Sequence, residues 1–317
     1  MTLAKQGSGC FIKVTDHFLE SIANSQPAIH GPTGAVTKRD RLYIDAQHGL
    51  GSRMRAYGSA AAIARATDRE LVVVWVPDVH CDCRFTDLFE YHGPVIESYE
   101  ELPGNLKLYN YMENEEGANK GAEIVFEAGK DVLARAAFVL NHSASHWETE
   151  CHEIRQLKPV KLITDLVNSV TLPANSIGVH VRMEAGKGLD NNAYDSPENW
   201  SSESHEQIHF WREKSHYSAF IKKIDSLLAS NPDMQIFLAT DLPENYEVFK
   251  NTYGNKLSYL PRTLYDRSKE QIYYALADAV LLSKTSHFLG STWSSFSEAA
   301  MRLSQSIKKI EMSGVDF

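Results

Sequence analysis

Several common features are scarce or missing in this sequence. Four cysteines among 317 residues are too few for a disulfide framework. No apolar run reaches 18 residues, so no transmembrane helix is indicated, and the first residues lack the apolar stretch of a signal peptide. Asp and Glu (41) outnumber Lys and Arg (32), and a formal net charge of -9 argues against general nucleic-acid binding. We therefore expect a reduced, cytoplasmic protein without an integral membrane segment.

The familiar phosphate and metal motifs are also missing. No G-x-x-x-x-G-K-[ST] phosphate-binding loop occurs, which argues against the usual classes of kinase and sulfotransferase. The turn at residues 48–53 carries Gly49 and Gly51, but Met54 stands at the third glycine position of the dinucleotide fingerprint. There is no D-x-D pair for a metal. The stretch 80–83 with His92 has soft ligands, but its spacing is poor for zinc, so no metal is expected.

Hydrophobic patterning from residue 41 onward predicts alternating strands and helices. In the first half, a strand, a helix and a buried strand follow one another as a βαβ unit, with weaker strand signals behind them. These segments are 42–44, 54–67 and 71–76, then 106–109 and 122–126. Helices are expected over 146–170, where we place the boundary between two domains.

The second half alternates more regularly. Four strands are expected at 175–180, 235–239, 256–260 and 286–289. Helices are expected at 216–230, 244–251, 270–282 and 294–304, and a long polar loop at 184–211. This alternation predicts a doubly wound parallel sheet.

The length accommodates two domains of about 150 residues each. We expect an α/β protein with an N-terminal extension at 1–40, of uncertain structure and packed with the first domain. A Rossmann-like acceptor-side domain at 41–170 and a Rossmann-like nucleotide-sugar domain at 171–317 would follow and face a cleft.

Polar residues follow the four strands of the second half. They are Arg182, Asp241, Arg262 and the run Gly290–Phe296. Ligands of open α/β sheets bind beyond the carboxyl ends of the strands, and a serine-rich helix start with an arginine suits a phosphate. Taken singly, Arg182 could equally be a surface ion-pair partner, and Ser294 and Asp241 could be helix caps. Together they favour a diphosphate site.

The order of several motifs resembles the fucosyltransferase superfamily, which includes the nodulation and core α-1,6-fucosyltransferases and the protein O-fucosyltransferases. The matching stretches, with bacterial-like segments at 83–89 and 156–160, run from about residue 43 to 304. They are 48–55, 178–182, 237–241 and 282–296. The resemblance implies a GT-B-like fold and inverting, metal-independent transfer from GDP-fucose.

The resemblance also implies roles for individual residues. Arg182 resembles the arginine that holds the donor diphosphate, and His180 resembles a residue near the nucleobase and ribose. Asp278 resembles the acid that reads guanine. The remaining donor-binding candidates are Gly49, Gly51, Arg53, Asp241, Ser294, Ser295 and Phe296.

One departure concerns the arginine pair of the core enzymes, because Met183 follows Arg182 here. The second cationic contact is then absent or comes from Arg53, Arg55 or Arg262. The general base that takes the acceptor proton would be Asp190, with Glu184 as the alternative.

The sequence therefore predicts a transferase of polysaccharide biosynthesis that moves fucose from GDP-fucose to a glycan hydroxyl, without another cofactor. Two alternatives stay open. One is a transferase that uses GDP-mannose or a UDP-sugar, and the other is a non-catalytic protein that binds sugar nucleotides or glycans. The sequence also leaves open whether the chain acts alone or as a homodimer.

Overall fold

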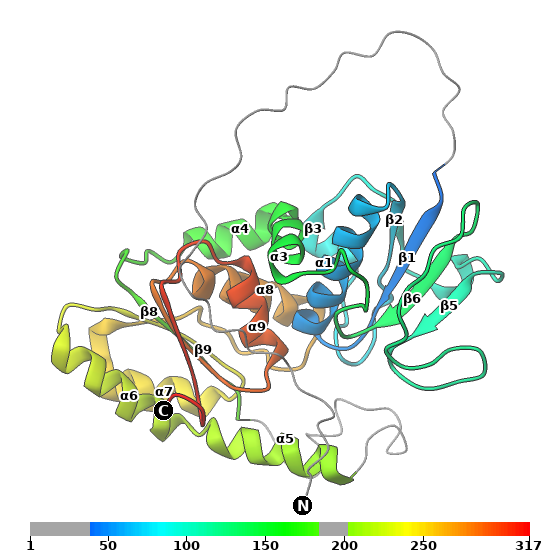
Figure 1. The fold of residues 1–317 in the computed structure, drawn as a ribbon. Coiled ribbons are helices and arrows are strands. Elements are labelled where there is room, and N and C mark those ends of the chain that lie inside the picture. Colours follow the sequence, from blue (N-terminus) through cyan, green and yellow to red (C-terminus); the bar gives the residue numbers. More distant parts are fainter. Residues whose placement is uncertain (1–38, 184–201) are drawn as a thin grey trace, which may run out of the picture. The chain divides into compact units, whose positions relative to one another are not determined.

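The first half of the chain forms a sheet of short, buried, parallel strands. The computed structural model describes residues 39–183 and 202–317, and 39–317 form one compact unit (Figure 1). Parallel pairing gives the strand order β4-β2-β1-β6-β5. The strands are β1 (Arg41–Ala46), β2 (Glu70–Val74), β4 (Val95–Ile96), β5 (Lys107–Asn110) and β6 (Val132–Ala136).

The second half forms another parallel sheet, with the order β10-β9-β8-β11-β12. Its three inner strands are buried along their whole length, as expected for strands covered on both faces. The strands are β8 (Ile177–Val181), β9 (Ile236–Thr240), β10 (Leu257–Ser258), β11 (His287–Gly290) and β12 (Lys309–Met312). A small antiparallel pair, β3 (Phe89–Glu90) and β7 (Lys158–Pro159), stands apart from both sheets.

Helices from both halves share one apolar core. Ile44 and Ala60 of the first half belong to the same buried cluster as Leu276 and Ala300 of the second half. α9 contacts α1, α3 and α8 (Figure 1). The α-helices are α1 (Leu50–Ala66), α2 (Phe85–Leu88), α3 (Trp147–Gln156), α4 (Lys161–Asn168), α5 (Ser202–Lys214), α6 (Tyr217–Ser230), α7 (Pro243–Tyr253), α8 (Lys269–Ser283) and α9 (Ser295–Leu303).

The expected α/β class with parallel sheets is confirmed, and most of the expected segments match within a few residues. The strand expected at 122–126 is wrong, because tyrosine hydroxyls take the place of a strand partner there. Tyr109 Oη contacts both backbone groups of Val125, and Tyr111 Oη donates to the Ala122 carbonyl. The strand that pairs with β1 on the side away from β2 is β6.

The long loop expected at 184–211 is wrong for its last part, since 202–211 belong to α5. This helix is polar on most of its surface, so it lacks the apolar periodicity that would predict it. The division into 41–170 and 171–317 stays a prediction. No helix in the described ranges is both long and apolar enough to cross a bilayer.

Candidate functional site

The expected polar residues gather at the carboxyl end of the second sheet. β8 lies between β9 and β11, so the residues after these three parallel strands share one edge. Ser291 ties two of the strand ends together: its Oγ donates to the His180 carbonyl (3.0 Å) and accepts from the Arg182 amide (2.8 Å). The turn that leads into α9 is thereby anchored to the end of β8.

Arg182 stands directly after β8 with its guanidinium held by Asp241. Nη1 of Arg182 donates to Asp241 Oδ2, and the other carboxylate oxygen accepts from the Met183 amide at 3.1 Å. Both side chains are largely buried, with 20% and 14% of their surface exposed. Asp241 therefore orients the arginine and is not the cap of α7, whose cap residue is Leu242.

Met183 does not replace the second arginine of the core enzymes with another cation. Its side chain packs partly buried against the apolar cluster of the second half, and its sulfur accepts from the Tyr217 amide at 3.2 Å. Met183 therefore adds no cation beside Arg182 at this strand end.

His180 faces α9. Its Nδ1 lies 2.7 Å from Ser297 Oγ, and its ring packs on Phe296 with centroids 4.7 Å apart. Burial lowers the pKa of His180 to about 3; Asp241 opposes this shift and the nearby Arg182 adds to it. The ring is therefore neutral near pH 7 and acts as a hydrogen-bonding group.

The start of α9 has the features of an anion site. Ser294 is the N-cap, and its hydroxyl accepts from the Ser297 amide at 3.5 Å. Trp293 precedes it with φ of 60°, an uncommon backbone conformation for a bulky residue, and 43% of its surface is exposed. Backbone N–H groups of a first helical turn are not used within the helix and favour negative charge. Strained residues of this kind concentrate at functional sites.

The start of α1 meets the start of α9. Ser52 Oγ donates to Ser295 Oγ at 3.1 Å, and a Cβ added to Gly51 would lie 2.4 Å from the Ser295 carbonyl oxygen. Gly51 thus permits a close approach of two helices, whereas a Cβ at Gly49 would have ordinary contact (3.8 Å from the His80 carbonyl oxygen). Contact of either glycine with a donor stays a prediction.

Arg53 lies in the first turn of α1, and its guanidinium reaches back to the turn that precedes the helix. Its guanidinium donates to the carbonyls of His48 (2.6 Å) and Val76 (2.9 Å) and pairs with Asp78 at 2.7 Å. Only 1% of this side chain is exposed, so Arg53 joins the turn to the loop after β2. Arg55 pairs with Glu298 of α9, and donor binding by either arginine stays a prediction.

Asp278 lies in α8 in a buried pair with Arg262. Nη2 of Arg262 donates to Asp278 Oδ2 and also to the Tyr246 hydroxyl at 3.2 Å. Among the described residues, Asp278 Oδ1 has no hydrogen-bond partner. Burial raises the pKa of Asp278 to about 6, although Arg262 opposes the shift. An unsatisfied buried oxygen is costly, which is compatible with an acceptor kept for a ligand.

Both proposed bases, Glu184 and Asp190, lie outside the described residues. Within the described parts, no three His, Cys, Asp or Glu side chains come close enough together to hold a metal ion. Cys81 and Cys83 are buried as thiols with their sulfurs 3.6 Å apart.

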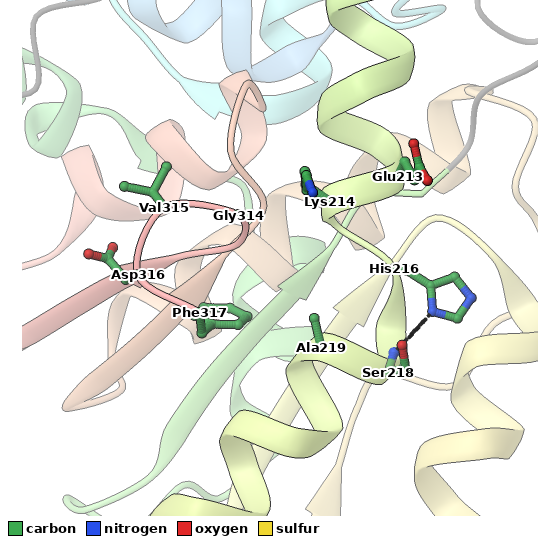
Figure 2. Close-up of a pocket in the computed structure, with 9 residues that line it drawn as sticks. All are labelled: Glu213, Lys214, His216, Ser218, Ala219, Gly314, Val315, Asp316 and Phe317. Carbon is green, nitrogen blue, oxygen red and sulfur yellow. Dashed lines mark hydrogen bonds between the residues drawn. The ribbon is translucent and has the colours of Figure 1, made fainter.

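A depression of about 490 Å³ lies between the end of α5, the start of α6 and residues 314–317 (Figure 2). Glu213, Lys214, His216 and Asp316 make its lining polar and mixed in charge. It borders the turn before α9, because Ser313 Oγ accepts from the Thr292 amide and contacts Ser215 Oγ.

The sequence did not single out two residues that organise this edge. Ser297 joins His180 to the Ser291 amide, which donates to Ser297 Oγ at 3.1 Å. Ser297 lies three residues after the N-cap serine, so the capping spacing was the available signal. Ser291 belongs to the run Gly290–Phe296 that was expected at the site, but its contacts with the end of β8 were not predicted.

Comparison with known proteins bears on the fold. The sequence matches no protein-family model, and no curated protein matches it significantly. Solved structures do match: NodZ α-1,6-fucosyltransferase soaked with GDP-fucose has a TM-score of 0.55 at 18% identity, over 84% of this chain and 93% of that chain. Fucosyltransferase NodZ from Bradyrhizobium has a TM-score of 0.56 at 18% identity, over 84% and 94%. POFUT1 in complex with GDP has a TM-score of 0.55 at 15% identity, over 89% and 100%.

These matches extend over most of each chain and agree with the resemblance found in the sequence motifs. The described chain therefore has the GT-B-like α/β fold of the NodZ and POFUT1 fucosyltransferases.

Proposed function

We propose that this chain is an inverting, metal-independent glycosyltransferase that moves fucose from GDP-fucose to a glycan hydroxyl. The observation that carries the proposal is the position of Arg182 beside the start of α9, in a fold similar to fucosyltransferases crystallised with GDP and GDP-fucose. In this proposal the donor lies in a cleft between the carboxyl ends of the two sheets.

Positive charge for the diphosphate would come from the protein itself. Arg182 and the first-turn amides of α9 stand at one strand end, in a chain whose net charge is -9. A guanidinium presents several N–H donors in a planar fork, so Asp241 can orient it while another edge meets a phosphate. Donors aimed at a leaving group are among the strongest contributions to catalysis.

The proposed step forms one bond and breaks one. The acceptor oxygen attacks C1 of fucose while the bond from C1 to the β-phosphate oxygen breaks, and GDP leaves with the electron pair. Asp190, or Glu184 in its place, takes the acceptor proton. Attack from the face opposite the phosphate inverts C1.

Calorimetry with a panel of nucleotides tests the donor. We expect GDP and GDP-fucose to bind and UDP to bind far more weakly. The absence of GDP binding would remove this proposal. Preferential binding of UDP would favour the alternative of a UDP-sugar transferase.

Slow hydrolysis of GDP-fucose tests the catalytic role of Arg182. We expect Arg182→Ala to lower the rate by about 10²–10³-fold, as for other oxyanion-stabilising groups. Arg65→Ala is the matched control, because the side chain of Arg65 is 65% exposed and its ion pair is with Glu153. An equal rate in wild type and Arg182→Ala would contradict the mechanism.

A further inference from the structure

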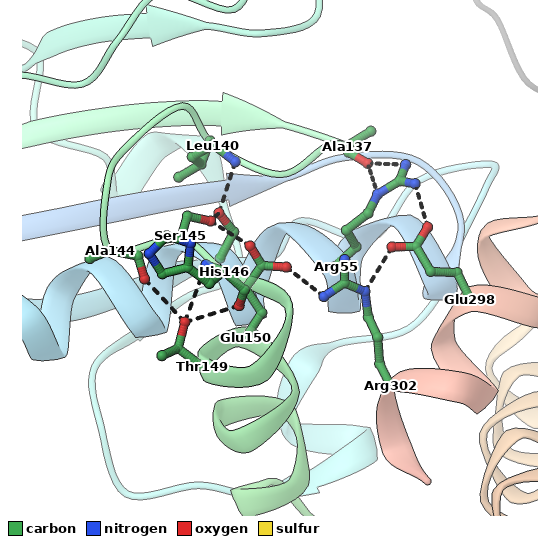
Figure 3. A network of polar contacts seen from close by, with 11 residues as sticks. Arg55, Ala137, Leu140, Ala144, Ser145, His146, Thr149, Glu150, Glu298 and Arg302 are labelled. Carbon is green, nitrogen blue, oxygen red and sulfur yellow. Dashed lines mark hydrogen bonds and ion pairs between the residues drawn. The ribbon is translucent and has the colours of Figure 1, made fainter. Parts of the chain in front are cut away.

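A chain of buried ion pairs connects α9 to the helices of the first sheet (Figure 3). Arg55 of α1 donates to Glu298 Oε2 at 2.7 Å, and Glu298 Oε1 accepts from Arg302 Nε at 2.7 Å. Arg302 in turn donates to Glu150 of α3 at 2.5 Å. The chain therefore runs from α1 through α9 to α3 and contains two cations and two anions.

The four side chains of this ion-pair network are largely shielded from water. Arg302 and Glu150 are each 4% exposed, and Arg55 and Glu298 about one fifth. Burial opposes the charge on Glu298, but Arg55 and Arg302 outweigh it and hold the pKa of this carboxyl below its usual value. Removing one partner from such a network leaves a buried charge without compensation.

Two adjacent residues of α9 contact the two different halves of the polypeptide. Ser297 contacts His180 at the end of β8, which belongs to the second sheet. Glu298 contacts Arg55, which also donates to the Ala137 carbonyl after β6 of the first sheet. The position of α9 relative to β8 and its position relative to α1 are thus set by separate contacts.

The contact with α1 lies at the first turn of α9. Glu298 is three residues after Ser295, and Ser295 touches Gly51 and Ser52 at the start of α1. α9 has only nine residues, so loss of its contact with α1 would let the first turn move. The amides of that turn are the ones proposed above to meet the donor diphosphate.

We infer that Arg55 and Glu298 are positioning residues of the donor site: their buried ion pair holds the first turn of α9 against α1 at the geometry that binds the diphosphate. The inference rests on the proposed function. It assigns part of the donor affinity to residues of the first sheet that do not themselves touch the donor.

The test compares Glu298→Gln, Arg55→Met and the double variant with wild type. Both single variants should weaken GDP binding by about tenfold or more, because a displaced first turn loses hydrogen bonds to a charged ligand. The double variant should lose less than the sum of the two single losses, because both single variants break the contact between Arg55 and Glu298. The amides of residues 297 and 298 bond to Ser294, and their hydrogen exchange in the nucleotide-free protein should become faster in all three variants.

Two control variants separate positioning from general loss of stability. Arg65→Met removes an exposed ion pair of the same helix α1 and should leave Kd for GDP unchanged. Ile224→Val shortens a fully buried side chain in the cluster of the second sheet, so it should lower Tm without changing Kd or exchange at α9.

The outcomes distinguish this inference from the proposed function. Unchanged Kd and unchanged exchange in Glu298→Gln would overturn the inference while the proposed function stands. A wild-type protein that does not bind GDP would overturn the proposed function and the donor role assigned to this pair. The rates of amide hydrogen exchange in wild type and Glu298→Gln would then still show whether Glu298 holds the first turn of α9.

Discussion

Gly51→Ala is the substitution that most directly tests the contact between the two helix starts. The added Cβ would lie 2.4 Å from the Ser295 carbonyl oxygen, 2.6 Å from its carbonyl carbon and 2.9 Å from the Phe296 nitrogen. Ordinary contact begins near 3.4 Å, so α1 and α9 would have to separate by about 1 Å. All three neighbours are backbone atoms and cannot rotate away as a flexible side chain would.

The expected cost follows from two opposing effects. Overpacking in a well-packed interior costs about 1–3 kcal/mol. Alanine in place of glycine within a helix returns up to about 1 kcal/mol, and less in a first turn. The free energy of unfolding should therefore fall by about 1–2 kcal/mol. GDP should bind about tenfold more weakly, because the displaced first turn of α9 loses a hydrogen bond to the charged diphosphate.

Urea denaturation and calorimetry with GDP measure the two effects. Gly104→Ala is the control, since a Cβ at Gly104 would meet nothing within 4 Å. It should stay within about 0.5 kcal/mol of wild type, as surface substitutions usually do. A Gly51→Ala protein as stable as wild type, with the same Kd for GDP, would refute the close approach of the two helices.

Two further predictions concern buried titratable groups. Because the folded pKa of His180 (about 3) lies below the usual 6.5, the unfolded chain takes up this proton first as pH falls. The free energy of unfolding should therefore fall by about 1.4 kcal/mol per pH unit from pH 6.5 toward pH 3. In His180→Gln, urea denaturation at several pH values should show a pH dependence that is smaller by about one proton. An unchanged pH dependence in this variant would contradict the prediction. Asp278→Asn should lower the preference for GDP over inosine diphosphate by about tenfold, because one hydrogen bond to a charged group is worth about that much. Asp165 is exposed, and Asp165→Asn should leave the preference unchanged. A variant that keeps the full preference would exclude Asp278 as the guanine reader.

The local pattern of the sequence was enough to predict the α/β class and most strands. Runs such as residues 71–76 and 236–239 are apolar along their length, which is typical of strands buried on both faces. The same reasoning placed Arg182 and Asp241 at one sheet edge, because parallel strands bring their carboxyl ends together. It failed for 122–126, where tyrosine hydroxyls hold the backbone, and for 202–211, where a polar helix has little periodicity.

Which residues of the site contact one another was decided by the tertiary structure. Arg55 and Glu298 are 243 positions apart, and Arg262 in the loop after β10 pairs with Asp278 of α8. Periodicity describes neighbours along one helix or strand, so it cannot assign such partners. The sequence by itself placed a glycine at position 51 of a turn and a serine-rich start at 294–297. Only the packing of α1 on α9 made that glycine a contact between helices and joined the two segments at one edge.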